Sequence, residues 1–325
     1  MKLSWKKMGL IFDPMQIENR PIWMDSFAQA PNAVMFDDFL RVYFCCRPQA
    51  DAKKQFVSYC AFVDFSKDGQ FTILNIAKEP ILELGALGCF DEFGTYPVSV
   101  IKTDKELLAY YGGWTRCESV PFNISIGLAR SADQGVSFKK IGSGPVLSHS
   151  PDEPFVVTSP KIRQFGSKWY LTYTTGVRWI RADDGRPEII YKLRMAISDD
   201  GVNWTKLNRN LILDVLGENE AQACPDIFYA NGKYHLFFCY REGLDFRTDV
   251  QRSYRIGYAT SSDLMDWHRN DSVIELSASD VGWDSEMVAY PNVFEMNGQV
   301  YMIYAGNGNG QTGFGIAKLE GDFNL

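Results

Sequence analysis

Hydrophobic and polar residues alternate with a period of two over most of the chain, and the alternation recurs in units. Each unit starts with a proline, two or three mostly apolar residues and a turn, followed by an aromatic-rich strand, as in PDIFYANGKYHLFF. Five prolines, 63 to 66 residues apart, start these units: Pro31, Pro97, Pro160, Pro225 and Pro291. Alternation with this period indicates strands rather than amphipathic helices, and near-constant spacing indicates a repeat fold.

The second half of each unit supplies two further strands and a characteristic turn. A short alternating strand such as YRIGYATS comes first, and in the middle copies a Ser/Asp turn with an aromatic residue follows, as in SDDGVNW and SSDLMDW. These turns resemble the Asp-box turns of β-propellers. We expect their Asp side chains to be structural, because they can accept hydrogen bonds from local backbone amides. Four strands in each of five copies predict an all-β, five-bladed β-propeller with four-stranded antiparallel blades.

The last copy lacks a fourth strand, because the printed sequence ends with FGIAKLEGDFNL. The N-terminal segment SWKKMGLIFD is similar to NWTKLNRNLILD, the fourth strand of the third copy. We therefore expect residues around Trp5 to Met8 to complete the last blade, which removes an open sheet edge. Residues 1–325 then form a single propeller domain.

Composition and charge narrow the classes of partner. The net charge is −7 without a run of Lys or Arg, which argues against nucleic-acid binding. No apolar stretch approaches the roughly 20 residues of a membrane helix, and the N-terminus lacks the features of a signal peptide. The seven cysteines form no CxxC pair and no Cys/His cluster, so neither a disulfide framework nor a zinc site is indicated. We expect a cytoplasmic protein without metal or cofactor, and the oligomeric state stays open.

Carboxylates recur before the repeated prolines. Asp25, Asp91, Glu220 and Glu286 lie five or six residues before their prolines, whereas the third copy has Phe155 in this place. The repeat would bring the four around one funnel, where crowding raises the pKa of a general acid. We predict these four as catalytic residues. The alternative is that individual carboxylates cap loops or pair with arginine.

Basic and aromatic residues are expected on the same face. Arginines follow the second strand of four copies, and they either neutralise the carboxylates or recognise an anionic substrate group. Aromatic rings near the propeller mouth are suited to stacking on sugars; Trp114 and Trp179 stand out because they are expected in loops. The four arginines are Arg47, Arg116, Arg178 and Arg241. The residues predicted to bind substrate are Glu92, Trp114, Arg116, Lys161, Arg178, Trp179, Asp226, Arg241, Asp284 and Tyr290.

Five blades, an acidic funnel and Asp-box-like turns resemble the glycoside hydrolase superfamily that includes families 32, 43, 62, 68, 117 and 130. WMDSFAQAPNA is similar to the first-blade WMNDPNG motif of family 32, and this resemblance implies that Asp25 is the nucleophile or base. Family 43 has its first-blade Asp directly before a proline, where this chain has Ala30, and the RDP pattern of family 32 is absent. The chain more closely resembles uncharacterised bacterial members that carry WMDSFAQAPN, FDEFGTYPVSV and GWDSEM.

These observations predict a glycoside hydrolase-like enzyme that cleaves a glycosidic bond of a small oligosaccharide or glycoconjugate with paired carboxylates. Glu220 is the expected acid, because the weakly polar neighbours Ala221, Ala223 and Cys224 could raise its pKa by desolvation. Asp91 would orient the sugar or tune that pKa. Two alternatives remain: a glycoside phosphorylase or glycosyl transferase that uses the arginines to bind phosphate, and a non-catalytic carbohydrate-binding propeller.

Overall fold

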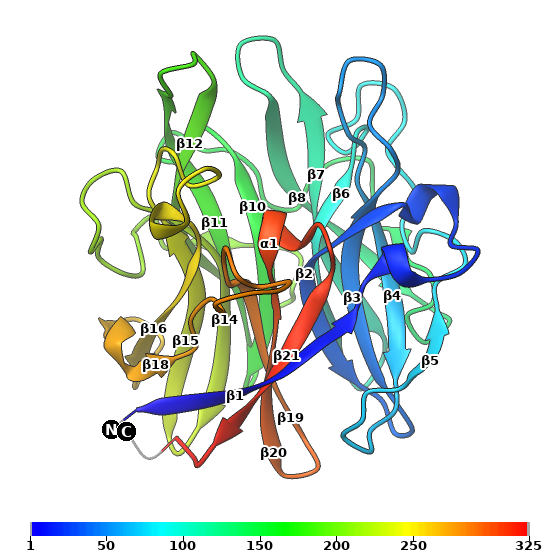
Figure 1. Cartoon of the computed structure of the whole chain (residues 1–325). Helices are drawn as coiled ribbons and strands as arrows, with labels where there is room; N and C mark the ends of the chain where they lie inside the picture. Colours follow the sequence, from blue (N-terminus) through cyan, green and yellow to red (C-terminus); the bar gives the residue numbers. More distant parts are fainter. Residues whose placement is uncertain (1, 324–325) are drawn as a thin grey trace.

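The computed structural model describes residues 2–323, which form five sheets arranged around a central axis (Figure 1). The first blade contains β2 (Ser26–Met35), β3 (Leu40–Arg47), β4 (Tyr59–Phe65) and β5 (Ile73–Ile76). The second blade contains β6 (Thr95–Lys102), β7 (Leu107–Arg116), β8 (Phe122–Ser131) and β9 (Lys139–Lys140). The third blade contains β10 (Val157–Phe165), β11 (Lys168–Arg181), β12 (Pro187–Ser198) and β13 (Thr205–Lys206).

The fourth blade contains β14 (Ala221–Ala230), β15 (Lys233–Arg241), β16 (Arg255–Ser261) and β17 (His268–Arg269). The fifth contains β19 (Ala289–Met296), β20 (Gln299–Ala305), β21 (Phe314–Glu320), β1 (Leu3–Phe12) and β18 (Ile274–Glu275). The short helical turns are η1 (Pro14–Gln16), η2 (Ile22–Met24), η3 (Val250–Arg252), η4 (Asp271–Val273) and α1 (Asn307–Gly310). Within residues 2–323, no helix has both the length and the apolar composition that crossing a membrane requires. The five-bladed all-β fold is as predicted.

The N-terminal strand closes the ring, as predicted. β1 pairs antiparallel with β21, with Trp5 opposite Leu319, and Figure 1 shows the two strands side by side. The short strand β18 adds to the other edge of β1 in parallel, with Leu3 opposite Ile274. β18 belongs to the connection from blade 4 to blade 5, so the last blade is held both by the chain's beginning and by its neighbour.

The repeated prolines lie in the innermost strands, and each lies within a break in the register with the second strand. The residues before four of them have left-handed φ angles between 48° and 58°: Ala30, Ser159, Cys224 and Tyr290. An extra residue in a strand turns the adjacent side chains in a new direction. Here the bulges bring the side chains just before the prolines to the central axis, where they meet those of the other blades.

Below these residues, hydrogen bonds between neighbouring inner strands close the channel. Asn32 accepts from the amide of Val100 (2.5 Å), and Asn292 accepts from the amide of Ala33 (2.6 Å). Asp226 accepts from the amide of Val293 (2.7 Å). Each bond crosses from one blade to the next, so these polar side chains are part of the ring's construction.

The Asp-box-like turns have the structural role expected from the sequence. Asp200 accepts hydrogen bonds from the amides of Val202 and Asn203 (both 2.8 Å) and from Ser198. These bonds lower the pKa of Asp200, because they favour its charged form. The aromatic residue after the turn packs on the preceding blade: Trp204 lies 5.8 Å from Tyr110, ring to ring.

Candidate functional site

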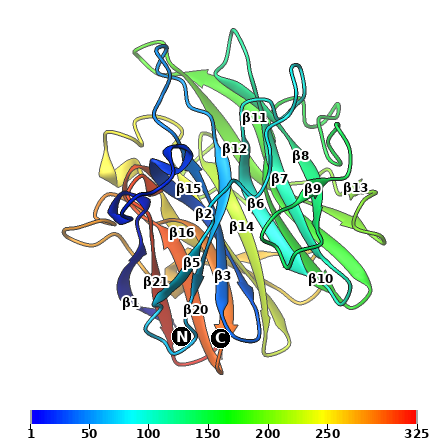
Figure 2. The same cartoon turned by 90° about the vertical axis from the view of Figure 1, so that its right-hand side faces the viewer.

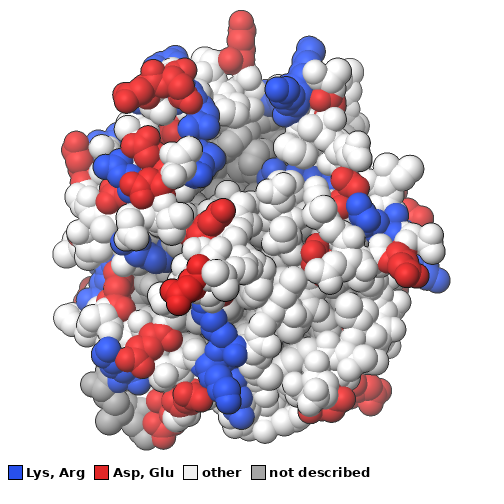
Figure 3. Space-filling view, in the orientation of Figure 1, with Lys and Arg blue, Asp and Glu red and all other residues white. Residues whose placement is uncertain are grey.

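A cavity of about 870 Å³ opens at one end of the propeller. Figure 1 and Figure 2 show long hairpins rising at this end, including β11–β12, and Figure 3 shows a hollow there with Lys and Arg side chains along its edge. The floor consists of residues at the proline bulges: Gln29, Tyr96, Ser159, Cys224 and Tyr290. All five blades thus contribute to one concave site, the usual form of a small-molecule site.

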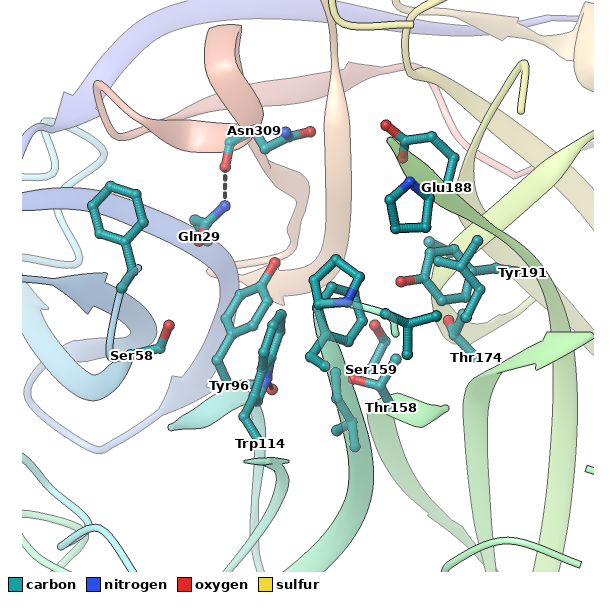
Figure 4. A pocket seen from close by; sticks show the side chains of 18 of the residues that line it. Gln29, Ser58, Tyr96, Trp114, Thr158, Ser159, Thr174, Glu188, Tyr191 and Asn309 are labelled. Carbon is teal, nitrogen blue, oxygen red and sulfur yellow. Dashed lines mark hydrogen bonds between the residues drawn. The ribbon is translucent and has the colours of Figure 1, made fainter. Parts of the chain in front are cut away.

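Aromatic side chains form much of the cavity wall. Trp114 lies 4.4 Å from Phe122 and 5.7 Å from Tyr96, measured between ring centroids, and Figure 4 shows Trp114 next to Tyr96. The indole N–H of Trp114 donates to the Tyr96 carbonyl (2.6 Å), which fixes the ring. Trp179 packs against Phe122 at 5.7 Å. Aromatic rings that line a cavity are suited to stacking on sugar rings.

Trp114 and Trp179 lie in the cavity, but in strands rather than in the loops that the sequence suggested. β7 and β11 continue beyond the blade, so that Trp114 pairs with Ile124 and Trp179 with Ile189. The segment around Trp179, expected to be a loop, is therefore mostly a hairpin of β11 and β12. Strands hold these rings more rigidly than a loop would.

The carboxylates of the cavity lining are Glu118, Glu188 and Glu286. Glu286 is exposed, and Asn307 accepts a hydrogen bond from its backbone amide (2.7 Å). Glu188, on β12, is 5% exposed and is bound by Arg186 (3.2 Å) and Arg247. No motif in the sequence marks Glu188, and its only signal is its place in the hairpin of β11 and β12, close to Trp179.

Asp91 does not lie in the cavity, so its predicted convergence on a funnel is wrong. Its side chain is buried, accepts from the hydroxyl of Tyr111 (2.9 Å) and pairs with Lys140 (2.5 Å) from the outermost strand β9. Burial and the Asp91 charge raise the pKa of Tyr111, which keeps this hydroxyl a donor. Asp91 therefore joins strands within its own blade.

Glu220 is also buried inside its blade and lies outside the cavity lining, so its predicted place in the funnel is wrong. It accepts hydrogen bonds from Arg269 (2.6 Å) and from the amides of Val215 (2.8 Å) and Leu216 (2.9 Å). Burial raises the pKa of Glu220, but the bonds from Arg269 and Val215 outweigh burial and lower it overall. A carboxylate with a lowered pKa is poorly suited to donate a proton near neutral pH.

The recurring carboxylates follow a structural rule of the blades. In three blades a carboxylate precedes the first strand, a tyrosine 20 residues later donates to it, and a lysine on an outer strand pairs with it. These sets are Asp91, Tyr111 and Lys140; Glu153, Tyr173 and Lys206; and Asp284, Tyr304 and Lys7. Asp284, predicted to bind substrate, thus has a structural position, and Glu153 fills the same position in the third copy.

Other predicted site residues also lie outside the cavity lining. Asp25 pairs with Arg20 (3.0 Å) at the end of η2, and Glu92 accepts from the amide of Gly88 (2.9 Å). Arg178 donates to Asn219 (2.6 Å). Each has a local partner outside the cavity that accounts for its position.

Lys161 and Asp226 lie below the cavity floor rather than in it. Asp226 is fully buried and binds Arg163 and Asn292, and it is part of the ring of inter-blade hydrogen bonds. Lys161 borders a small void of about 10 Å³ among the central prolines. Burial lowers the pKa of Lys161, and the charge of Asp226 opposes this effect. Their predicted contact with substrate conflicts with this position.

The remaining predicted residues lie in the cavity. Arg116 stacks on Phe93 (4.3 Å) near the rim, and Tyr290, in the floor, lies 5.9 Å from Tyr254. The predicted residues in the cavity also include Trp114, Trp179, Arg241 and Glu286. Arg47, one of the four arginines that follow second strands in the sequence, lines the cavity as well. Among residues 2–323 no group of three His, Cys, Asp or Glu side chains is placed to hold a metal ion.

Comparison with known proteins relates this chain to two groups. No protein-family profile matches it. Two uncharacterised proteins of Mycobacterium tuberculosis, MT1551 from strain CDC 1551 and Rv1502 from strain H37Rv, are each 34% identical over 320 residues, covering 98% of this chain and 100% of the relative.

Solved structures share the fold at low sequence identity. A glycosyl hydrolase from Bacteroides ovatus has a TM-score of 0.70 and 15% identity, covering 97% of this chain and 94% of that one. A thermostable family-43 glycoside hydrolase has a TM-score of 0.63 and 14% identity, covering 94% and 93%. The Bombyx mori GH32 β-fructofuranosidase BmSUC1 has a TM-score of 0.60 and 19% identity, covering 90% and 61%. The chain therefore belongs to the family of the mycobacterial protein Rv1502 and has the five-bladed β-propeller fold of glycoside hydrolases.

Proposed function

We propose that this protein is a glycoside hydrolase-like enzyme that binds a short saccharide in the cavity and cleaves a glycosidic bond there. The observation that carries the proposal is the cavity itself, which has a closed floor, aromatic walls and an unpaired carboxylate, in a fold shared with glycoside hydrolases. A cavity of about 870 Å³ suits a short saccharide rather than a polymer chain.

Glu286 is the carboxylate best placed for proton transfer. Within residues 2–323 its carboxylate forms no ion pair or side-chain hydrogen bond, unlike Asp91 and Glu220. In the proposed reaction Glu286 protonates the leaving oxygen as the glycosidic C–O bond breaks. Water then bonds to the anomeric carbon and passes a proton to a second carboxylate, for which Glu188 is the candidate. Both come from the cavity lining; Glu286 belongs to the four carboxylates predicted from the sequence, and Glu188 does not.

Glu286→Gln tests this role against a panel of aryl glycosides and short oligosaccharides. We expect hydrolysis to fall by about 10²-fold or more, the scale of general acid–base catalysis, with saccharide binding retained. Glu79→Gln is the matched control, because Glu79 is exposed and lies outside the cavity. Wild-type rates in Glu286→Gln would assign the proton transfer to another group and overturn this mechanism.

A saccharide-binding propeller without catalysis is the second candidate, and the cavity floor favours it. The floor residues Gln29, Tyr96, Ser159, Cys224 and Tyr290 include no carboxylate. The resemblance to family 43 would place an Asp directly before the first-blade proline, where this chain has Ala30. Saccharide binding by calorimetry, with no turnover of the whole panel, would select this candidate over the hydrolase.

A further inference from the structure

Two arginines of the cavity carry charges that the described protein does not neutralise. Arg47 ends β3 in blade 1 and Arg241 ends β15 in blade 4, and both line the cavity. Arg241 is 2% exposed, and its guanidinium donates to the backbone carbonyls of Glu242 (2.7 Å) and Gly243 (3.3 Å). The Nε atoms of both arginines are buried without a hydrogen-bond partner, and neither arginine forms an ion pair within residues 2–323.

Aromatic rings fix both guanidinium groups without cancelling their charge. Arg47 lies 4.6 Å from the ring centre of Phe27 and 5.2 Å from that of Phe56. Arg241 lies 3.4 Å from Phe246 and 5.4 Å from Tyr254. Stacking holds the plane of a guanidinium and leaves its N–H edge available for a planar or tetrahedral oxyanion.

Arg41 and Arg269, whose side chains are buried, are paired with carboxylates, which sets the buried Arg241 and the half-buried Arg47 apart. Arg41 binds both carboxylate oxygens of Asp64 (2.6 and 2.8 Å), and Arg269 binds Glu220 and Asp271. Burial alone lowers the pKa of Arg41, but the hydrogen bond to Asp64 raises it overall. Burial also lowers the pKa of Arg47, where neighbouring tyrosine and cysteine side chains offset only part of the effect. An unpaired buried charge costs free energy in the absence of a ligand, so its presence in a cavity indicates an anionic one.

The charge of the whole cavity agrees with an anionic ligand. Its basic residues are Lys54, Arg47, Arg116, Arg186, Arg241 and Arg247. The acidic ones number three, and Glu188 among them is already bound by Arg186 and Arg247. The cavity is therefore positive in a protein whose net charge is −7. Such a local reversal of sign attracts and orients anions.

We propose that the saccharide bound in this cavity carries an oxyanion, as a sugar acid or sugar phosphate does, and that Arg47 and Arg241 bind that group. This inference rests on the proposed function and specifies its substrate class. The aromatic wall at Trp114 and Trp179 would contact the sugar ring, while the two arginines bind the charged substituent through charge-assisted hydrogen bonds. Free inorganic phosphate would offer the arginines the same oxyanion, and the experiment distinguishes it from a sugar that carries the group.

Calorimetric titration of the full chain with glucuronate, glucose 1-phosphate, glucose and inorganic phosphate tests the proposal. We expect at least one anionic sugar to bind about tenfold or more tightly than glucose, and added salt to weaken that binding. Arg47→Gln and Arg241→Gln should each reduce affinity for the anionic sugar by about tenfold or more and leave the affinity for glucose unchanged. Arg130→Gln, which alters an exposed pair with Glu106, is the control.

Thermal unfolding of each variant shows whether a loss of binding comes from a loss of the fold. We expect Arg47→Gln and Arg241→Gln to melt at or above the wild-type temperature, because each removes a half-buried or buried charge that has no carboxylate partner, whereas Arg41→Gln breaks an ion pair and should melt lower. Equal affinity for glucose and both anionic sugars would overturn the anionic substrate class while leaving the hydrolase proposal intact. If inorganic phosphate binds as tightly as glucose 1-phosphate, the arginines bind free phosphate, and the proposal that the oxyanion belongs to the saccharide is wrong. Glycoside hydrolysis is measured separately, so the hydrolase proposal fails on its own ground if the wild-type protein turns over no glycoside of the panel or if Glu286→Gln keeps wild-type rates.

Discussion

At the scale of single residues, the partners of a charged side chain indicate its role better than its position in the repeat does. Asp91 and Glu220 recur at nearly the same offset as Glu286, yet the first two are buried in ion pairs and only Glu286 faces the cavity. Arg41 and Arg241 are similarly buried, but only Arg241 lacks a carboxylate partner within residues 2–323. In this propeller, charged side chains with an oppositely charged partner have structural roles, and those without such a partner are free to bind a ligand.

Glu220→Gln should destabilise the protein rather than abolish a chemical step. Removing the carboxylate leaves Arg269 with Asp271 as its one acidic partner and replaces the charged acceptor of two backbone amides with a neutral one, so the free energy of unfolding at pH 7 should fall by about 1–3 kcal/mol. Urea unfolding monitored by tryptophan fluorescence measures this. Unchanged stability with lost hydrolysis would restore Glu220 as a catalytic residue.

The pH dependence of that stability has a definite sign. The pKa of Glu220 is lower in the folded protein than its ordinary value of 4.5, so the folded state holds the charged form more strongly. Its contribution is complete above the unfolded value and is lost as pH falls through the folded one. The wild-type protein should therefore lose more stability on acidification below about pH 5 than Glu220→Gln does.

The sequence predicted the fold fully but the site only in part, and the reason lies in side-chain direction. Repeat spacing places Asp91 and Glu220 at equivalent heights, but both precede the innermost strands β6 and β14, so strand alternation does not determine which way they point. The residues that do reach the cavity floor, such as Ser159 and Cys224, are directed there by bulges that the sequence marks only through the following proline.

At the scale of elements, extended hairpins and the loops they hold shape the mouth of the cavity. β11 and β12 continue past the blade and carry Trp179 and Glu188 to the rim. Glu188 then binds Arg247, from the connection between β15 and β16. A strand of one blade is thereby tied to a loop of the next, which limits the motion of that loop.

Glu188→Gln should loosen this loop without unfolding the propeller. The variant loses its ion pairs to Arg186 and Arg247, both of which are partly exposed, so global stability should change by only about 1 kcal/mol. We expect trypsin to cleave after Arg247 or Arg252 several times faster than in wild type, as followed by mass spectrometry. Glu106→Gln, which breaks an exposed ion pair on blade 2, should leave that rate unchanged. Equal cleavage rates in wild type and both variants would show that Glu188 does not hold the loop in place.

At the scale of the whole molecule, the ring is closed by contacts between segments that are far apart in sequence. β1 supplies the fourth strand of the last blade, and Lys7 on β1 pairs with Asp284 (2.6 Å), nearly the whole chain away. Trp5 is 4% exposed and packs edge to face against Phe237 of blade 4 at 5.9 Å. Opening the ring at this point would also release the cavity wall, because Glu286 lies two residues after Asp284.

Removal of residues 1–12 should therefore destabilise the entire propeller and abolish saccharide binding along with it. The truncated chain exposes the edge of β21, uncovers apolar surface around Phe237 and leaves Asp284 without Lys7. We expect a melting temperature at least about 10 °C lower, or no cooperative transition, by calorimetry. Lys7→Met keeps the strand and loses only the ion pair, so it should melt between the two. A synthetic peptide of residues 2–13 should partly restore the melting temperature when added to the truncated chain. If the truncated and full-length chains melt together, the N-terminal strand is dispensable and ring closure must come from the other blade contacts.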